Sequence, residues 1–345
     1  METLNLEMYT RSSLPKRKKN TIWWLLLLFL VLAVAASTVA YFVFFTYKDT
    51  YNFNTRFNSI YTDNSNIYKH KSFAYNLATQ GVDNVDDSAY TYQAEAGVLC
   101  DISNSKVLFS RNCFSKMQPA STTKIMTAYL ALKYSKLTDE VTVGDEVLGL
   151  DKASSMAGLK VGDKLSMEQL LYGLMLASGN DAANVIAKHV SGDIDSFIEL
   201  MNKEAVDLAA VDTHFVNPHG LPDENHYTSA YDLYLIINAA LGFDDFSKIA
   251  SSASYQANYS DEQGNIVTKN WINSNKFLNT KEPFSLPEGF KTVAGKTGTT
   301  LAAGNCLVLA SRDENSVTYV SVVLKAPDKT ILYDTTAKLL ADFKQ

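Results

Sequence analysis

The chain has 345 residues, of which 46% are hydrophobic and 20% charged, the balance of a globular protein with a sizeable core. The net charge is −6, and because basic residues gather near the N-terminus, the rest of the chain is more acidic than the whole. An acidic chain without a basic stripe is not expected to bind nucleic acid. The three scattered cysteines, Cys100, Cys113 and Cys306, are too few for a disulfide framework and lack zinc-site spacing.

The N-terminal region contains a long uncharged stretch. Residues 1–20 are polar and end in the basic run 16–19, and no charged residue occurs from Ile22 to Tyr47. A helix of this length can cross the roughly 30 Å hydrocarbon core of a bilayer. We therefore expect a cytoplasmic segment at 1–20, a single-pass transmembrane signal anchor at 21–47, and an extracytoplasmic remainder, as the positive-inside rule predicts. The run exceeds a usual signal-peptide core, which favours an uncleaved anchor over the alternative of cleavage.

The next segment, 48–88, is rich in Asn, Ser, Asp and Tyr and is predicted to be an extracytoplasmic linker. Docking of its aromatic residues on the following domain is the alternative. The folded domain is expected to occupy 89–345. It would begin with strands at 92–100 and 106–109, joined by a turn at 103–105.

The middle of the domain is predicted to be helical and its end to return to strands. Expected helices are one containing Ser121 and Lys124, then 166–176 with a Ser166–Gln169 capping box, 182–189, 194–208 and 231–240. Strands follow at 290–294, 305–311 and 316–324, and a last helix at 331–343. Strands at both ends around a helical middle predict an α/β (α+β) domain whose sheet is built from the two chain ends, with a helical insertion.

Ser121 and Lys124 are the first candidates for chemistry. Their spacing of three places both side chains on one face of a helix, one turn apart. A lysine amine with a lowered pKa can take the proton of a serine hydroxyl and make it a nucleophile. The first helical turn also favours developing negative charge. Such pairs recur by chance on solvated helix faces, so the pair alone is weak evidence.

Two later motifs strengthen the case that Ser121 and Lys124 are catalytic. Ser178-Gly179-Asn180 is a predicted tight loop between helices and offers a hydroxyl and a carboxamide. Lys296-Thr297-Gly298-Thr299, predicted just after the strand ending at Ala294, offers a cation, two hydroxyls and a glycine that permits close backbone approach. Together the motifs supply a nucleophile, a base, a proton relay and an anion clamp, the groups that acyl transfer requires.

Ser121-x-x-Lys124, Ser178-x-Asn180 and Lys296-Thr297-Gly298 resemble the three motifs of penicillin-binding proteins and serine β-lactamases. With Asn217-Pro218-His219-Gly220 and Ala303-Gly304, the chain resembles the D-alanyl-D-alanine carboxypeptidases of serine peptidase family S11, the low-molecular-mass penicillin-binding proteins. The resemblance implies a β-lactamase/transpeptidase-like fold, an antiparallel sheet with a helical subdomain, a catalytic domain at 89–345 and a bacterial cell membrane location.

The resemblance also implies residue roles. Ser121 would attack the carbonyl between two D-alanines of a peptidoglycan stem peptide, with Lys124 as base and Ser178 as proton relay. Asn180 would hold the substrate amide, and Lys296, Thr297, Gly298 and Thr299 would hold the terminal carboxylate. The backbone N–H groups of Ser121 and Thr299 would form the oxyanion hole. β-Lactam antibiotics would acylate Ser121.

No cofactor or metal is expected. His214, His219 and His226 cluster in sequence, but their loop matches the family's Asn-Pro-His-Gly loop, where His219 would be structural. Cys100 and Cys113 are expected to stay free thiols rather than form a disulfide, because the predicted hairpin does not place them opposite each other. Many family members carry a second β domain and a C-terminal anchor after the catalytic domain. In this chain little sequence follows the last predicted helix. We therefore expect the N-terminal span to be the tether.

Three alternatives stay open. A serine β-lactamase of class A needs a glutamate after the second motif, and 213–221 contains none, while Glu224 lies in a different context. Endopeptidase or transpeptidase action on crosslinks would use the same site. A membrane-anchored binding protein with a dead site is disfavoured by the complete set of motif residues.

Overall fold

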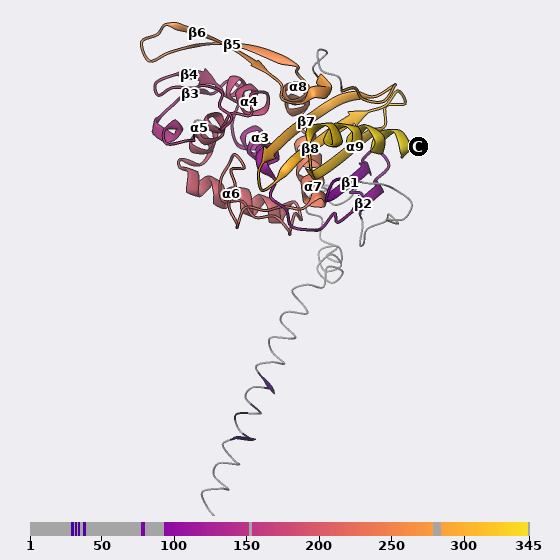
Figure 1. Cartoon of the computed structure of the whole chain (residues 1–345). Coiled ribbons are helices and arrows are strands. Elements are labelled where there is room, and N and C mark those ends of the chain that lie inside the picture. The colour runs from indigo at the N-terminus through magenta and orange to yellow at the C-terminus, as the bar shows by residue number, and fades with distance from the viewer. Residues whose placement is uncertain are drawn as a thin grey trace, which may run out of the picture. The chain divides into compact units, whose positions relative to one another are not determined.

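A computed structural model describes residues 93–151, 154–278 and 284–343, together with 77–79 and six positions between Phe29 and Thr38 (Figure 1). The predicted cytoplasmic segment and most of the predicted span at 21–47 and linker at 48–88 lie outside the described residues. The six described positions of the span are helical and exposed. Within the described part of the chain, no helix combines the length and apolar character needed to cross a bilayer.

The larger sheet joins strands from both ends of the domain. β1 (Ala96–Asp101) and β2 (Lys106–Arg111) form the first hairpin, and β7 (Lys291–Thr300), β8 (Gly304–Arg312) and β9 (Thr318–Ala326) come from the C-terminal part. The strand order is β2-β1-β9-β8-β7, and each neighbouring pair is antiparallel. This confirms the predicted antiparallel sheet built from both chain ends.

Both faces of this sheet are covered by helices. On one face, Leu307 and Leu309 of β8 share a core with α9 (Lys329–Asp342). On the other, the intervening Val308 packs with Ile237 of α7 (Ala230–Ala240). Because both faces are buried, β8 and β9 are apolar almost throughout rather than alternating.

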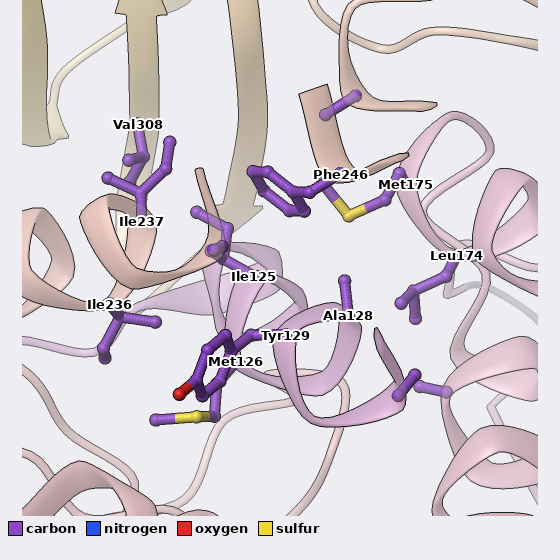
Figure 2. Packing of buried hydrophobic residues seen from close by; sticks show 14 of the residues in the cluster. Ile125, Met126, Ala128, Tyr129, Leu174, Met175, Ile236, Ile237, Phe246 and Val308 are labelled. Atoms are coloured by element: carbon purple, nitrogen blue, oxygen red, sulfur yellow. The ribbon is translucent and has the colours of Figure 1, made fainter. Parts of the chain in front are cut away.

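Helix α3 (Lys124–Tyr134) is the central element of the other half of the domain. Its residues from Lys124 to Ala131 are all buried, as expected for a helix surrounded by other elements. Figure 2 shows Ile125, Met126, Ala128 and Tyr129 of α3 among side chains of its neighbours, including Leu174, Met175, Ile236, Ile237, Phe246 and Val308. The helix that carries Lys124 is therefore held rigidly by the core.

The other helices of this half are α4 (Met167–Met175), α5 (Asn180–Ser191) and α6 (Ile194–Asp207). The predicted capping box of α4 is confirmed: the Gln169 backbone N–H donates to Ser166 Oγ, and the Ser166 N–H donates to Gln169 Oε1. Helix α5 begins at Asn180, two residues earlier than predicted, so the second motif runs directly into a helix.

A second sheet was not predicted from the sequence. It has the order β3-β4-β5-β6, with β3 (Glu140–Thr142) and β4 (Lys164–Ser166) followed by the long hairpin of β5 (Ser254–Ser260) and β6 (Ile266–Ile272). The short helix α8 (Asp244–Ala250) precedes the hairpin. The hairpin strands bury few side chains and extend away from the helices in Figure 1. Tyr255, Ala257 and Tyr259 alternate with polar residues in β5, but β6 has no regular apolar alternation of the kind by which strands are recognised.

Residues 77–79 dock on the domain. Ala78 is fully buried, its backbone N–H donates to the Tyr234 hydroxyl at 2.9 Å, and the Tyr231 hydroxyl donates to its carbonyl at 2.8 Å. Both backbone polar groups of this residue are thus satisfied by α7. This contact is made by the backbone of Ala78, whereas the docking alternative concerned the aromatic residues of the segment, so both interpretations of 48–88 stay predictions.

The three cysteines form no disulfide, as predicted. All three are buried, and Cys100 of β1 lies opposite Val107 rather than Cys113.

Candidate active site

Ser121 lies in a 3-10 turn, Ala120–Thr123, and not in an α-helical turn as predicted; α3 starts only at Lys124. In a 3-10 turn residues i and i+3 eclipse each other. The two predicted side chains are accordingly brought together, with Lys124 Nζ 3.0 Å from Ser121 Oγ. Spacing predicted the contact correctly although it predicted the wrong type of helix.

The amine of Lys124 is enclosed by protein. Besides Ser121 it contacts the Asn180 side-chain oxygen at 2.8 Å and the His219 carbonyl oxygen at 2.7 Å. Its side chain is fully buried. Burial, and next the positive charge of Lys296, hold the pKa of Lys124 well below the ordinary lysine value. An amine that loses its proton so readily can act as a base.

The partners of Lys124 decide which contact can transfer a proton. The amide oxygen of Asn180 and the carbonyl oxygen of His219 can only accept hydrogen bonds. They therefore take the two N–H groups of a neutral amine. The lone pair is left for the third contact, the Ser121 hydroxyl.

The Ser178-Gly179-Asn180 loop connects α4 to α5. Ser178 has a positive φ of 57°, an uncommon conformation for a residue with a side chain, and it lines the same pocket as Ser121. Asn180 turns its oxygen toward Lys124, so its NH2 group faces away from that amine. The loop thus brings the second motif to the first, as predicted.

Asp181 positions one wall of the site and was missed by the sequence analysis. Its buried carboxylate accepts hydrogen bonds from the backbone N–H groups of Ala157, Gly158, Leu159 and Ala182 at 2.8–2.9 Å. The wall it holds includes Ser155, whose carbonyl accepts from the Asn180 N–H at 2.9 Å. The signal available was an acidic residue in the first turn after the motif.

The third motif lies within a strand. Lys296-Thr297-Gly298-Thr299 was predicted just after a strand ending at Ala294, but β7 continues to Thr300 and pairs with β8 throughout the motif. The polar sequence conceals this strand because the face that carries Thr297 and Thr299 meets the pocket rather than a core.

Gly298 permits a close approach between β7 and the Ser121 turn. A Cβ atom on Gly298 would lie 2.9 Å from both the Ser121 nitrogen and the Pro119 oxygen. Real Cβ atoms are not found at such distances, so a side chain here would push the strand away from the nucleophile. The predicted role of this glycine, close backbone approach, agrees with the geometry.

Lys296 is buried, with only 1% of its surface exposed. Its ammonium donates to the Thr297 carbonyl oxygen at 2.9 Å, and burial lowers its pKa to about 7. Its neighbour Thr297 places its hydroxyl 2.7 Å from Ser274 Oγ, and Thr299 Oγ1 donates to Asn305 at 3.3 Å. The threonines, unlike the lysine, face the pocket.

A pocket of about 190 Å³ lies between these elements. From the predicted motifs it is lined by Ser121, Ser178, Thr297, Gly298 and Thr299. The other lining residues were not predicted from the sequence: Ser155, Ser274, Lys276, Lys329, Leu332 and Tyr333. No acidic side chain is among these lining residues in the described part of the chain.

The turn before Ser121 is held in an uncommon conformation. Ala120 has a φ of +49°, and its carbonyl accepts from the Thr123 hydroxyl at 2.9 Å. His226 accepts the Val216 N–H on Nδ1, so Nε2 carries the hydrogen and donates to Thr123 Oγ1 at 2.9 Å. The two imidazoles nearest the site are therefore engaged by protein groups, since His219 Nδ1 accepts from the Leu221 N–H.

The comparisons with known proteins agree with this geometry. Residues 83–328 match the family model of D-alanyl-D-alanine carboxypeptidases. The chain is 32% identical over 244 residues to D-alanyl-D-alanine carboxypeptidase DacF of Bacillus subtilis, covering 69% of this chain and 59% of that protein. It is 35% identical over 264 residues to DacC of Escherichia coli, covering 73% and 61%. The chain thus spans about three fifths of the length of these curated relatives.

Among solved structures, the Streptomyces K15 DD-transpeptidase is similar at 30% identity and a TM-score of 0.67, with 73% of this chain and 97% of that one covered. The mixed α/β architecture is therefore that of the penicillin-binding proteins. The family match covers all three motifs and the strands and helices that bring them together. The chain belongs to the D-alanyl-D-alanine carboxypeptidase family, peptidase family S11.

Proposed function

We propose that this protein is a serine D-Ala-D-Ala carboxypeptidase that removes the terminal D-alanine from peptidoglycan stem pentapeptides through an acyl-enzyme on Ser121. Its catalytic domain would occupy 89–345. The uncharged stretch from Ile22 to Tyr47 would anchor it in the bacterial cell membrane, with the domain on the extracytoplasmic side where its substrate lies. Family membership and the site geometry support this proposal.

The observation that carries it is the environment of Lys124. A buried amine of low pKa, whose two other partners can only accept, has one contact through which it can receive a proton, and this contact is Ser121. Such a pair makes a nucleophile without help from a histidine.

The reaction then proceeds in two balanced steps. Ser121 Oγ bonds to the carbonyl carbon between the D-alanines as its proton passes to Lys124. The peptide C–N bond breaks as a proton passes by way of Ser178 to the leaving amine, which departs as D-alanine. Water then attacks the ester, and Ser121 regains its proton as the shortened peptide leaves.

The oxyanion formed in each step would be held by the backbone N–H groups of Ser121 and Thr299. Gly298 supports this assignment, because its close approach brings the strand that carries Thr299 against the Ser121 turn. Removing one oxyanion donor typically costs about 3–4 kcal/mol of transition-state stabilisation.

The substrate would lie along β7. The free side of an edge strand can pair with an extended peptide through main-chain hydrogen bonds. The Asn180 NH2 group would bind the substrate amide, and Lys296 and Thr297, with Thr299, would hold the terminal carboxylate.

A β-lactamase function is not favoured. No carboxylate lines the described pocket to activate a deacylating water, and Glu224 is exposed. We therefore expect penicillin to form a persistent adduct on Ser121. Deacylation within seconds would contradict this.

The test uses the full-length protein in detergent, a fluorescent penicillin and a denaturing gel. Wild type and a Ser260→Ala control on the distant β5 strand should give a persistent band, and Ser121→Ala should give none while unfolding at nearly the same temperature. Release of D-alanine from a diacetyl-L-Lys-D-Ala-D-Ala peptide should follow the same pattern. A labelled Ser121→Ala band would show that the nucleophile is another residue.

A further inference from the structure

A series of three hydrogen bonds ends on the peptide group that joins Ala120 to Ser121. The Val216 backbone N–H can only donate, so it fixes His226 Nδ1 as an acceptor at 3.1 Å. The ring hydrogen is then on Nε2 and donates to Thr123 Oγ1 at 2.9 Å. Because this hydroxyl accepts from the imidazole, its own hydrogen donates to the Ala120 carbonyl oxygen at 2.9 Å. Each bond of the series therefore has a single direction.

The peptide group at the end of this series carries the Ser121 N–H, a proposed donor of the oxyanion hole. The carbonyl and the N–H of one peptide are conjugated, so a hydrogen bond accepted by the oxygen polarises the N–H and makes it a stronger donor. The Ser121 nitrogen lies beside β7, since a Cβ atom on Gly298 would be 2.9 Å from it. In a trans peptide the N–H and the carbonyl point in opposite directions. The Thr123 hydroxyl thus holds this peptide from the side opposite to the oxyanion.

The side chains of this series are buried. Thr123 is fully buried and His226 is 1% exposed, and the imidazole packs edge-on against Phe215 with ring centroids 5.6 Å apart. Hydrogen bonds in such surroundings are stronger than in water and reinforce one another. Ala120 has a positive φ of 49°, which an alanine keeps only where its surroundings enforce it. The bond from Thr123 is one of the contacts that enforce it.

We propose that Thr123 and His226 are positioning residues of the oxyanion hole, which fix the direction of the Ser121 N–H and strengthen it as a donor. Neither residue is among those that line the described pocket. This inference rests on the proposed function and deepens it. Stabilisation of the oxyanion then depends on a histidine that lies 103 residues from Thr123 in the sequence.

A purely structural role for these two residues would leave a different kinetic signature. An oxyanion-hole donor stabilises the transition state more than the bound substrate, so weakening it lowers kcat and leaves KM nearly unchanged. Loss of an ordinary buried hydrogen bond lowers the free energy of unfolding without this selective effect. The two roles can therefore be separated by measuring kcat, KM and stability on the same variants.

The first test uses Thr123→Val in the full-length protein, which removes the hydroxyl at nearly constant volume. For release of D-alanine from diacetyl-L-Lys-D-Ala-D-Ala, kcat should fall about fivefold at unchanged KM. Thr123→Ser keeps a hydroxyl and should restore most of the rate. Thr336→Val is the matched control, because Thr336 is also fully buried and its hydroxyl donates to the Leu332 carbonyl oxygen at 2.8 Å. It should keep the wild-type kcat. A wild-type kcat in Thr123→Val would overturn the proposal.

The second test observes the oxyanion hole itself. Penicillin labelled with carbon-13 at the β-lactam carbonyl places the label in the ester on Ser121, and the infrared stretch of this carbonyl reports the hydrogen bonds that it accepts. The band should move to higher wavenumber in Thr123→Val and stay in place in Thr336→Val. Only acylated protein contributes to the band, so an unfolded fraction does not affect the result. A band that does not move in Thr123→Val would contradict the proposal.

A double-mutant cycle tests whether His226 acts through Thr123. His226→Gln removes the donor to Thr123 but leaves the hydroxyl, so kcat should fall less than in Thr123→Val. The double variant should lose no more activity than Thr123→Val alone. Additive losses in kcat would overturn the role of His226. Failure of wild type to release D-alanine and to bind penicillin would instead refute the acyl-transfer function.

Discussion

Gly220 lies against the carbonyl oxygen of Ala120 so closely that no side chain fits between them. Both residues have positive φ angles, 90° at Gly220 and 49° at Ala120. Ala120 directly precedes Ser121, so the turn that presents the hydroxyl is supported by a loop from a distant part of the sequence. The same loop supplies the His219 carbonyl to Lys124.

Gly220→Ala should therefore disturb both the fold and the nucleophile. The methyl group would collide with the Ala120 carbonyl, and an alanine at this positive φ would be strained. Together these effects should lower the free energy of unfolding by at least about 2 kcal/mol. Acylation by fluorescent penicillin should fall as well. Gly264→Ala is the control, since its φ is also positive at 84° but nothing lies within 4 Å. Equal losses in the two variants would show that the contact with Ala120 is unimportant.

The pH dependence of acylation should respond to Lys296. Lys124 must be neutral to accept the proton, so the acylation rate rises as pH passes its lowered pKa. The charge of Lys296 lowers that pKa, so Lys296→Gln should raise it and move the acidic limb of the pH–rate profile to higher pH. Lys291→Gln, an exposed position on the same strand, should leave the limb in place. A limb that stays fixed in Lys296→Gln would mean that another group titrates.

Acid should destabilise the fold through His219 and His226. Burial lowers the pKa of His219 to about 3 and that of His226 to about 4, below the ordinary 6.5. Above pH 6.5 both histidines are neutral in the folded and in the unfolded chain, so they contribute no pH dependence to the free energy of unfolding. Below it the unfolded chain binds protons that the folded chain does not, so stability falls by up to about 1.4 kcal/mol per histidine per pH unit.

Urea unfolding between pH 6.5 and 5 measures this slope. His226→Gln should reduce this slope by about half. It should also lower the free energy of unfolding at neutral pH by about 1–3 kcal/mol, because the hydrogen bonds to Thr123 and Val216 are lost. His189→Gln controls for the loss of an imidazole outside this loop. A His226→Gln slope equal to that of wild type would contradict the assignment.

Asp181→Asn should loosen the wall that contains Ser155. The new amide would turn its NH2 group toward backbone N–H donors that now bond a carboxylate. We therefore expect the free energy of unfolding to fall by roughly 2–4 kcal/mol. Hydrogen exchange should increase at residues 157–159. Asp207→Asn, an exposed carboxylate paired with Lys203 on α6, should change stability by less than about 0.5 kcal/mol. Unaltered exchange at 157–159 would argue that Asp181 does not hold the wall.

Local sequence determined the chemical groups and much of the secondary structure. The Ser166–Gln169 capping box, the spacing of Ser121 and Lys124, and the strands near both ends depend on neighbours within a few residues, and each could be predicted. The strand character of Lys296-Thr297-Gly298-Thr299 could not be, because it arises from pairing with β8 and not from apolar alternation. The β5–β6 hairpin was missed because most of its side chains are exposed and β6 lacks apolar alternation, although Tyr255, Ala257 and Tyr259 alternate with polar residues in β5.

Tertiary structure decided how those groups work. Lys124 loses its proton readily because α3 is buried on all sides and Lys296 lies nearby, and neither fact is visible in a four-residue motif. Lys329 and Tyr333 line the pocket from a helix outside the predicted motifs. Asp181, Gly220 and His226 lie in or near predicted motifs, but their contacts with the site were not assigned from the sequence. Their roles depend on burial and on contacts between distant parts of the chain, which only the folded arrangement of both sheets around α3 specifies.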